Sequence, residues 1–361
     1  MNTRSDAVFI IAEAGVNHNG DLVLAKQLIQ AAAAAGADAV KFQSFVVDEL
    51  VTPEVGMADY QRRNLDSEQS QYEMLSRLAL SFEAQRALAL YAAEQGIMWL
   101  SSPFDLTSLA FLVDEMHLSL LKIPSGELTN GPLLLAAARS SLPLIVSTGM
   151  ATLEDIQHAL AILAFGALDK TSAPTPEALG DLFNNPAALA ALRQRVTLLH
   201  CTSEYPAPAD SINLRAMQTL REHFKLPVGF SDHSQGIHIP VAAAALGACV
   251  IEKHFTLDRQ LPGPDHLASL EPDELGQMVR QIREIELAVG DGRKQPTAAE
   301  LNTAACARRR LVALRPIAEG ECFNESNLGV RRHHAGRSGL DYWQLLGRPA
   351  GRDYQAGEGI A

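Results

Sequence analysis

Leu226-Pro-Val-Gly-Phe-Ser-Asp-His233 and Ala248-Cys-Val-Ile-Glu-Lys-His254-Phe-Thr are the stretches that decide the fold of this chain. Each contains a short apolar run that breaks into polar residues, the pattern of a buried strand in a parallel sheet. Residues 234–247 lie between them and contain an alanine-rich stretch of helical character. The sequence therefore predicts a strand–helix–strand unit that brings His233 and His254 to the same edge of one sheet.

Two histidines at one sheet edge suggest a metal site. Neutral imidazoles are common ligands of divalent transition metals, so His233 and His254 are candidate metal ligands. The alternative is that each is a structural histidine satisfied by hydrogen bonds. Their paired placement favours the metal site over that alternative.

The same alternation of strand and helix extends over most of the chain. Helical periodicity is present in residues 22–35, 82–95 and 153–164. Eight apolar runs have the character of buried strands: residues 8–12, 39–42, 98–100, 120–123, 144–146, 196–200, 227–230 and 249–251. This alternation predicts an α/β fold, a closed (β/α)8 TIM barrel. An open doubly wound sheet is less favoured, because no glycine-rich dinucleotide turn follows the first strand.

Two connections between these elements are unusually long. Residues 44–81 follow a strand end, where barrel loops commonly form lids or substrate walls. Residues 166–195 follow a helix, and we expect a peripheral elaboration there.

The organisation of the chain changes towards its C-terminus. We expect a catalytic barrel over residues 1–285, a linker over 286–305 and a small β-rich domain over 306–361. A domain this small is marginal alone and is expected to dock against another surface. The basic run Arg308–Arg310 fits a solvated linker or a subunit contact better than a phosphate site.

Composition narrows the class of protein. The 361 residues are 47% hydrophobic and carry a formal net charge of −12, which argues against nucleic acid or an anionic membrane as partner. No apolar run reaches the ~18 residues of a membrane span, and residues 1–6 lack a secretory apolar core. The cysteines form neither a CxxC pair nor a metal-binding spacing, so we expect reduced thiols and a cytoplasmic protein. They are Cys201, Cys249, Cys306 and Cys322.

Polar side chains follow the apolar run of every predicted strand. The carboxyl ends of barrel strands open onto one mouth, so these side chains are expected to share a site. The candidates are two lysines, four serines and two glutamates: Lys41, Lys122, Ser102, Ser125, Ser147, Ser231, Glu13 and Glu127.

These residue types favour carbon–carbon bond chemistry on a small anionic substrate. Lysine binds phosphate or carboxylate as a point charge, and serine hydroxyls donate to the remaining oxygens. Glu13 and Glu127 are candidate proton donors and acceptors, and a metal at the histidines would polarise a carbonyl group. The alternative for Lys41 and Lys122 is that they form ion pairs with those same glutamates.

Seven motifs follow one another along the chain: Ile11-Ala-Glu-Ala-Gly-Val-Asn-His-Asn-Gly20, Val40-Lys-Phe-Gln-Ser44, Lys122-Ile-Pro-Ser-Gly-Glu127, Ser147-Thr-Gly-Met150, His200-Cys-Thr-Ser-Glu-Tyr-Pro206, Gly229-Phe-Ser-Asp-His-Ser234 and Glu252-Lys-His-Phe-Thr256. In this order they resemble the motifs of the bacterial sialic acid synthases. Those enzymes condense phosphoenolpyruvate with an N-acetylated aminohexose to a nine-carbon α-keto acid sugar and release phosphate. The resemblance implies a (β/α)8 barrel joined to a small antifreeze-like (SAF) domain, which reaches into the partner's active site in a domain-swapped homodimer.

The resemblance implies a role for each matching residue. It assigns phosphoenolpyruvate to Lys41, Lys122, Ser102, Ser125, Ser147, Ser203 and Ser231; the amino sugar to Gln43, Asn64, Tyr205 and Asp265; and its N-acetyl group to Arg332. It assigns proton transfer and water to Glu13 and Glu127, and a divalent metal, manganese before magnesium or cobalt, to His233 and His254. One loop departs from the family pattern: His333-His-Ala-Gly-Arg337 stands where Pro-Gly-Asn-Gly is usual, so Arg331 or Arg337 could replace Arg332.

The sequence leaves the identity of the acceptor sugar open. We expect N-acetylmannosamine first, giving N-acetylneuraminate, and then the deoxy diacetamido sugar of a legionaminic acid synthase. Pseudaminic acid synthase fits the motifs less well. Two different classes are a Schiff-base aldolase that uses Lys41 or Lys122, and a sugar-binding protein without catalysis.

Overall fold

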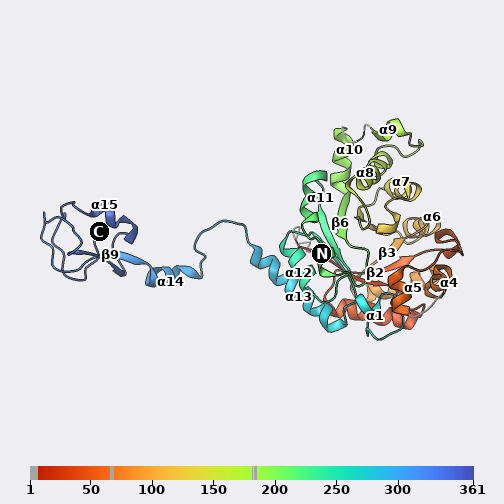
Figure 1. Cartoon of the computed structure of the whole chain (residues 1–361), viewed down its shortest axis with the longest axis horizontal. Coiled ribbons are helices and arrows are strands. Elements are labelled where there is room, and N and C mark those ends of the chain that lie inside the picture. Colours follow the sequence, from red (N-terminus) through yellow and green to blue (C-terminus); the bar gives the residue numbers. More distant parts are fainter. Residues whose placement is uncertain (1–6, 66–68, 181, 183–184) are drawn as a thin grey trace. The chain divides into compact units, whose positions relative to one another are not determined.

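The computed structural model describes residues 7–65, 69–180, 182 and 185–361 (Figure 1). Residues 1–6, for which we expected no secretory segment, lie outside these ranges. The chain divides into two compact units, Met1–Gly290 and Asp291–Ala361, which are described separately. Within the described ranges, no helix is both long and apolar enough to cross a membrane.

The first unit is built on one eight-stranded sheet of parallel strands. Its order is β3-β2-β1-β8-β7-β6-β5-β4, and β3 also lies against β4, so the sheet closes on itself. The strands are β1 Phe9–Gly15, β2 Ala39–Ser44, β3 Met98–Pro103, β4 Leu121–Ile123, β5 Leu144–Ser147, β6 Val196–Cys201, β7 Val228–Asp232 and β8 Val250–His254. All eight predicted strands and the TIM-barrel class are confirmed, and the open doubly wound sheet is excluded.

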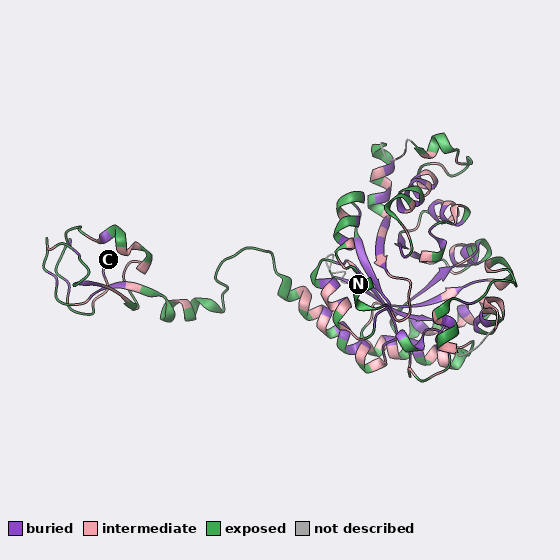
Figure 2. Ribbon diagram, in the orientation of Figure 1, coloured by how far each residue is buried: buried purple, intermediate pink, exposed green. Residues whose placement is uncertain are grey.

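Helices surround the sheet and cover its outer face (Figure 2). Those between consecutive strands are α1 Leu22–Ala35, α5 Phe82–Glu94, α6 Leu106–Ala110, α7 Gly131–Arg139, α8 Leu153–Leu168, α11 Ala216–Phe224, α12 His238–Ala245 and, after β8, α13 Pro272–Val289. Helix α1 has the predicted bounds because Asp21 caps its N-terminus, and Gly36 ends it in the left-handed region at φ 81°. Helix α8 continues beyond the predicted residue 164 to Leu168.

The two long connections carry helices of their own. Residues 44–81 contain α2 Val47–Leu50, α3 Asp59–Leu65 and α4 Gln71–Leu78. Residues 166–195 contain α9 Pro176–Gly180 and α10 Pro186–Arg195, and α10 packs on α8.

The interior of the barrel is built in layers, because side chains of a strand alternate between its two faces. An apolar layer separate from the helix-facing core fills the barrel with Ile11, Ala39, Leu100, Ile145, Leu199 and Val250. Two residues further along the same strands, the same face carries Glu13, Lys41, Ser102, Ser147, Cys201 and Glu252. These polar residues, predicted to follow the apolar runs, therefore lie within the strands above the apolar layer, whereas Ser125 and Glu127 follow β4 in a short 3-10 helix.

The outer face of β7 and β8 carries a fully buried ion pair. The Nζ atom of Lys253 lies 2.6 Å from Oδ2 of Asp232, and both side chains are 0% exposed. The same ammonium also donates to the backbone carbonyl of Ser234, whose N–H donates to Asp232. These contacts tie together the two strand ends that carry the histidines.

The second unit is small and contains an antiparallel pair of strands. Strands β9 Arg309–Ala313 and β10 Leu328–Arg332 pair, and α14 Glu300–Ala307 and α15 Tyr342–Leu345 flank them in sequence. Its own apolar core consists of Leu311, Ala313, Ile317, Phe323, Leu328, Leu345, Ala350, Tyr354 and Ile360.

Substitution Asp232→Ala is expected to destabilise the barrel strongly. It leaves the Lys253 ammonium buried without its carboxylate, and breaking a buried pair in this way costs about 3–5 kcal/mol. The free energy of unfolding from urea titrations, with EDTA present, measures this loss. In the matched control Asp59→Ala, an exposed pair with Arg62 is lost, and the expected cost is below about 1 kcal/mol. Equal losses in the two variants would contradict the structural role of the buried pair.

Candidate active site

A cavity of about 560 Å³ opens at the carboxyl ends of the barrel strands. It gathers the predicted residues from all eight strands or the loops that follow them. Of the site residues predicted from sequence, all but Asn64 and Arg332 line it: Glu13, Lys41, Gln43, Ser102, Lys122, Ser125, Glu127, Ser147, Ser203, Tyr205, Ser231, His233, His254 and Asp265.

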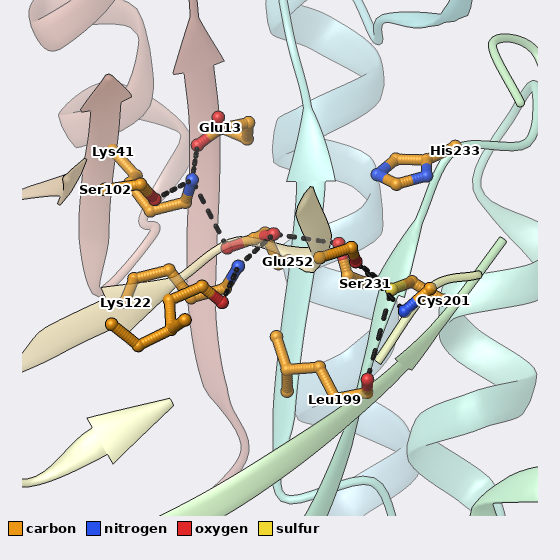
Figure 3. Close-up of polar contacts among 12 residues, drawn as sticks. Glu13, Lys41, Ser102, Lys122, Leu199, Cys201, Ser231, His233 and Glu252 are labelled. Carbon is orange, nitrogen blue, oxygen red and sulfur yellow. Dashed lines mark hydrogen bonds and ion pairs between the residues drawn. The ribbon is translucent and has the colours of Figure 1, made fainter. Parts of the chain in front are cut away.

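The floor of the cavity is a buried network of alternating charges (Figure 3). Nζ of Lys41 lies 2.6 Å from Oε2 of Glu13 and 3.6 Å from Oε2 of Glu252. On the other side, Oε1 of Glu252 lies 3.5 Å from Nζ of Lys122. Ser102 accepts a hydrogen bond from Lys41 at 3.1 Å, and Ser231 donates to Glu252 at 2.8 Å. The alternative of lysine–glutamate pairing is therefore correct for Lys41, but Lys122 pairs with a glutamate that was not predicted.

The negative charge of Glu252 and the positive charges of its two lysine neighbours stabilise one another. Burial by itself would raise the pKa of Glu252, but Lys122 and then Lys41 lower it to about 2. Burial lowers the pKa of Lys122. Burial also acts to lower the pKa of Lys41, but the charges of Glu13 and Glu252 outweigh this effect and raise it. Glu252 is thus a permanent carboxylate that holds two cations in a small buried space.

Glu13 differs from Glu252 in its protonation. Burial raises the pKa of Glu13 to about 7, since Lys41 opposes this effect only in part and the charge of Glu252 adds to it. A carboxyl group with a pKa near neutrality can both donate and accept a proton at physiological pH. Glu13 therefore has the properties of an acid/base group.

The serine hydroxyls on the other side of the cavity crowd around a glycine. The N–H of Gly149 donates to Oγ of Ser125 at 3.0 Å, and Ser125 also contacts the thiol of Cys201 at 3.2 Å. A Cβ atom at Gly149 would lie 2.4 Å from Oγ of Ser203 and 2.8 Å from Oγ of Ser125. Only glycine lets the backbone approach these hydroxyls so closely, which keeps a group of donors together.

The two histidines lie together, and both are neutral at physiological pH. Their ring centroids are 5.4 Å apart. Burial lowers the pKa of His233 to about 4, and burial together with His233 lowers that of His254 well below its usual value. Nδ1 of His233 donates to the carbonyl of Thr202 at 2.6 Å, whereas Nδ1 of His254 is buried and has no hydrogen-bond partner among the residues that the structure describes.

The chemistry of this pair suits a metal ion. Neutral imidazoles bind metals through a nitrogen lone pair, and an unsatisfied buried nitrogen is costly without a ligand. No group of three or more His, Cys, Asp or Glu side chains in the described ranges is arranged to hold a metal. An ion at His233 and His254 would therefore have two protein ligands and leave its other positions to water or substrate.

Aromatic rings lead from the histidines to the connection between β2 and α5. The ring of Tyr205 stacks on His233 at 4.1 Å and meets His254 edge-on at 5.4 Å. Tyr60 on α3 follows at 4.8 Å from Tyr205. Asp265 lines the same part of the cavity, and burial raises its pKa to about 6.

Asn64, Glu127 and Arg332 have surroundings different from those of the other predicted site residues. Asn64 is outside the lining, and its Nδ2 donates to the carbonyl of Pro264 at 2.6 Å. Glu127 lines the cavity, accepts a hydrogen bond from Asn130 at 2.7 Å and has a pKa raised by burial. Arg332 ends β10 in the second unit, so the first unit by itself does not contain it.

Glu252 was missed among the predicted site residues. The alternation of side chains along β8 would have found it, because residues two apart on a strand share a face. With His254 in the cavity, Glu252 must face the barrel interior, and Lys253 must face the helices.

The sequence profile of the NeuB family matches residues 28–294. The chain belongs to the NeuB family. Two relatives are named N,N'-diacetyllegionaminic acid synthase. One, from Campylobacter jejuni, is 47% identical over 97% of both chains. The other, from Legionella pneumophila, is 43% identical over 97% of this chain and 92% of its own.

A solved structure agrees with this membership of the NeuB family. The N-acetylneuraminic acid synthetase from Leptospira borgpetersenii is 34% identical, with a TM-score of 0.65 over 82% of this chain and 90% of its own. The predicted resemblance to the sialic acid synthases is confirmed, and the protein is an enzyme of this sugar-acid synthase family.

The two buried glutamates are expected to affect stability in opposite ways as pH changes. The folded-state pKa of Glu13 is raised, so the stability it contributes is complete below pH 4.5 and is lost as pH rises through 7. Glu13→Gln should therefore gain stability relative to the native protein, on the order of 2 kcal/mol between pH 5 and pH 8. Urea unfolding at the two pH values, in EDTA, measures this difference.

Glu252→Gln is the matched control. The folded-state pKa of Glu252 is lowered to about 2, so its contribution is complete above pH 4.5 and constant between pH 5 and pH 8. This variant should be less stable than the native protein by the same amount at both pH values. Parallel behaviour of the two variants would show that the glutamates do not differ in protonation.

Proposed function

We propose that this enzyme condenses phosphoenolpyruvate with 2,4-diacetamido-2,4,6-trideoxymannose and water, giving a legionaminic acid and phosphate. The observation that supports the reaction best is the floor of the cavity, where Lys41 and Lys122 flank Glu252 beneath two neutral histidines. The acceptor follows from the relatives, since those 47% and 43% identical are named for this product. The expected preference for N-acetylmannosamine is less well supported, because the relative named for sialic acid is 34% identical.

In this proposal, phosphoenolpyruvate binds on the floor of the cavity. Lys41 and Lys122 supply two buried ammonium groups, while Glu252 neutralises only one of their charges. When Glu13 is protonated, the cluster keeps a net positive charge in a site shielded from water. Hydroxyls of Ser102, Ser125, Ser147, Ser203 and Ser231 complete the set of donors for phosphate and carboxylate oxygens.

A divalent metal, manganese before magnesium or cobalt, would be held by His233 and His254. When bound there, it would polarise the aldehyde oxygen of the open-chain acceptor. The residues present fit such an ion, because both imidazoles are neutral and, within the described part of the chain, Nδ1 of His254 has no hydrogen-bond partner.

The reaction then proceeds in three steps. The alkene carbon of phosphoenolpyruvate attacks the aldehyde carbon, and the aldehyde oxygen takes up a proton as the new bond forms. The cation left at the phosphate-bearing carbon adds water, which gives up a proton. The resulting tetrahedral species loses the proton of its new hydroxyl as its C–O bond to phosphate breaks, which gives the keto acid and free phosphate. Fixed charges around the cavity stabilise these developing charges.

Glu13 is the group best suited to move these protons. Its pKa of about 7 lets it donate and accept a proton near neutral pH, and its contact with Lys41 brings it beside the proposed phosphoenolpyruvate site. Glu127, with its pKa raised by burial, is the second candidate and lines the same cavity.

We also propose that the second unit is an antifreeze-like (SAF) domain of a domain-swapped homodimer. Its small antiparallel sheet is consistent with that role. In such a dimer, Arg332 of one subunit would meet the N-acetyl group of the acceptor in the other, with Arg331 or Arg337 as alternatives. We propose further that the protein is a cytoplasmic enzyme that binds neither nucleic acid nor membrane.

Phosphate release is the direct test of the reaction. With manganese and phosphoenolpyruvate, the enzyme is expected to release phosphate at least tenfold faster, in kcat/KM, with the diacetamido sugar than with N-acetylmannosamine. A coupled phosphate assay with the two sugars and with N-acetylmannosamine 6-phosphate measures this ranking. No release with any sugar would favour a sugar-binding protein without catalysis, and a preference for N-acetylmannosamine would return the assignment to sialic acid.

Chelation separates the metal mechanism from a Schiff-base aldolase. His233→Ala and His254→Ala are expected to lower kcat by at least a hundredfold while the far-ultraviolet circular dichroism stays unchanged, and EDTA should abolish native turnover. An aldolase that uses Lys41 or Lys122 would instead ignore EDTA and be trapped by borohydride with pyruvate. His158→Ala on helix α8 is the control and should retain activity. Full activity of either cavity variant after chelation would exclude the metal assignment.

A further inference from the structure

One wall of the cavity is apolar, in contrast to its charged floor. Its side chains come from the residue after β1, from the segment after β3 and from helices α2 and α4. They are Val16, Leu50, Met74, Leu75, Leu78 and Phe104, called the apolar wall below. The reaction proposed above makes no use of it.

The apolar wall is a fixed structure with its own small core. Its members belong to a hydrophobic cluster separate from the main core of the barrel. Ser70 and Glu73 form a capping box at the start of α4, and the hydroxyl of Tyr72 donates to Asp48 of α2 at 2.7 Å. The bond between Tyr72 and Asp48 joins α4 to α2, and the capping box fixes the start of α4, so the wall is already formed in the absence of a ligand.

Two leucines of the wall remain incompletely covered. Leu50 and Leu75 are half-buried and line the cavity, while Met74 and Leu78 also line it but are buried. Leu65 packs on the same cluster and is half-buried too, but it does not line the cavity. Leu50 and Leu75 thus present apolar surface to whatever occupies the cavity.

The position of the wall matches the far end of the acceptor. The ring series from His233 through Tyr205 to Tyr60 has steps of 4.1 and 4.8 Å and leads from the histidines to α3. Helix α3 contacts the wall, because Leu65 at its end packs in the same hydrophobic cluster as Leu50 of α2 and Leu75 of α4. A sugar chain with its aldehyde at the histidines, extended along Tyr205, therefore directs its last carbons towards the wall.

The two candidate acceptors differ at those last carbons. The diacetamido sugar carries an acetamido group at carbon 4 and a methyl group at carbon 6, whereas N-acetylmannosamine carries hydroxyls there. A hydroxyl pressed against an apolar wall loses its water without gaining a hydrogen bond, but a methyl group gains by burial. The wall thus favours the first sugar and disfavours the second.

We propose that the apolar wall is the subsite for the carbon 4 and carbon 6 substituents of the acceptor, with Leu50 and Leu75 as specificity-determining residues. The inference rests on the proposed function. It adds that discrimination between acceptors comes from this wall and not from the histidines or the lysines. A difference of one apolar group in such a pocket changes selectivity about 10- to 200-fold.

The experiment compares selectivity in matched variants. Leu50→Gln and Leu75→Gln are expected to lower the ratio of kcat/KM for the diacetamido sugar over N-acetylmannosamine by about tenfold or more, because a polar side chain then faces the substituents. Leu65→Gln, the same change in the same cluster outside the cavity, should keep the native ratio within about twofold. Thermal unfolding and KM for phosphoenolpyruvate should stay close to native in all variants that fold.

Leu75→Ala provides a second route if a glutamine variant does not fold. It keeps the wall apolar but shortens it, so KM for the diacetamido sugar should rise several-fold without improved use of N-acetylmannosamine. Unchanged selectivity in both cavity variants, or an equal fall in Leu65→Gln, would overturn the assignment of the wall. The proposed function fails separately, if the native enzyme does not turn over the diacetamido sugar.

Discussion

Glu252 lies between two buried lysines, and the rest of the site is arranged around this contact. Two ammonium groups cannot share a dry cavity unless a carboxylate offsets part of their charge. Glu252 does so and keeps its charge, while Glu13 on the other side of Lys41 holds its proton near neutral pH. The floor therefore keeps a positive charge that suits an anion, and its buried charges are paired with one another.

The closed barrel provides the structural support for this network of buried charges. Each strand contributes alternate side chains to the interior, so a layer of apolar residues supports a layer of charges directly above it. Between Glu252 and His254 on the same strand, Lys253 faces the helices on the outer side of β8 and forms a buried ion pair with Asp232. One strand thus carries the carboxylate of the floor, a buried structural cation and a histidine of the mouth.

The fold was predictable because its signal is local. Eight apolar runs separated by helical segments were enough to predict the barrel, and every run is a strand of the closed sheet. The helices within residues 44–81 were not predicted, because three short helices of mixed composition lack a long periodic pattern. The lining of the cavity was predictable for most residues, since polar side chains at strand ends converge on one mouth.

The sequence by itself determined which strand side chains face the interior of the barrel, because it fixes the order of the strands and the two-residue alternation of side chains along each. It also carried the family membership through its ordered motifs. Only the tertiary structure decided which charges pair, which imidazoles are neutral and that α2 and α4 add an apolar wall. These properties depend on burial and on distances between residues such as Lys41 and Glu252, which lie on strands distant in the sequence and interact only once the barrel closes.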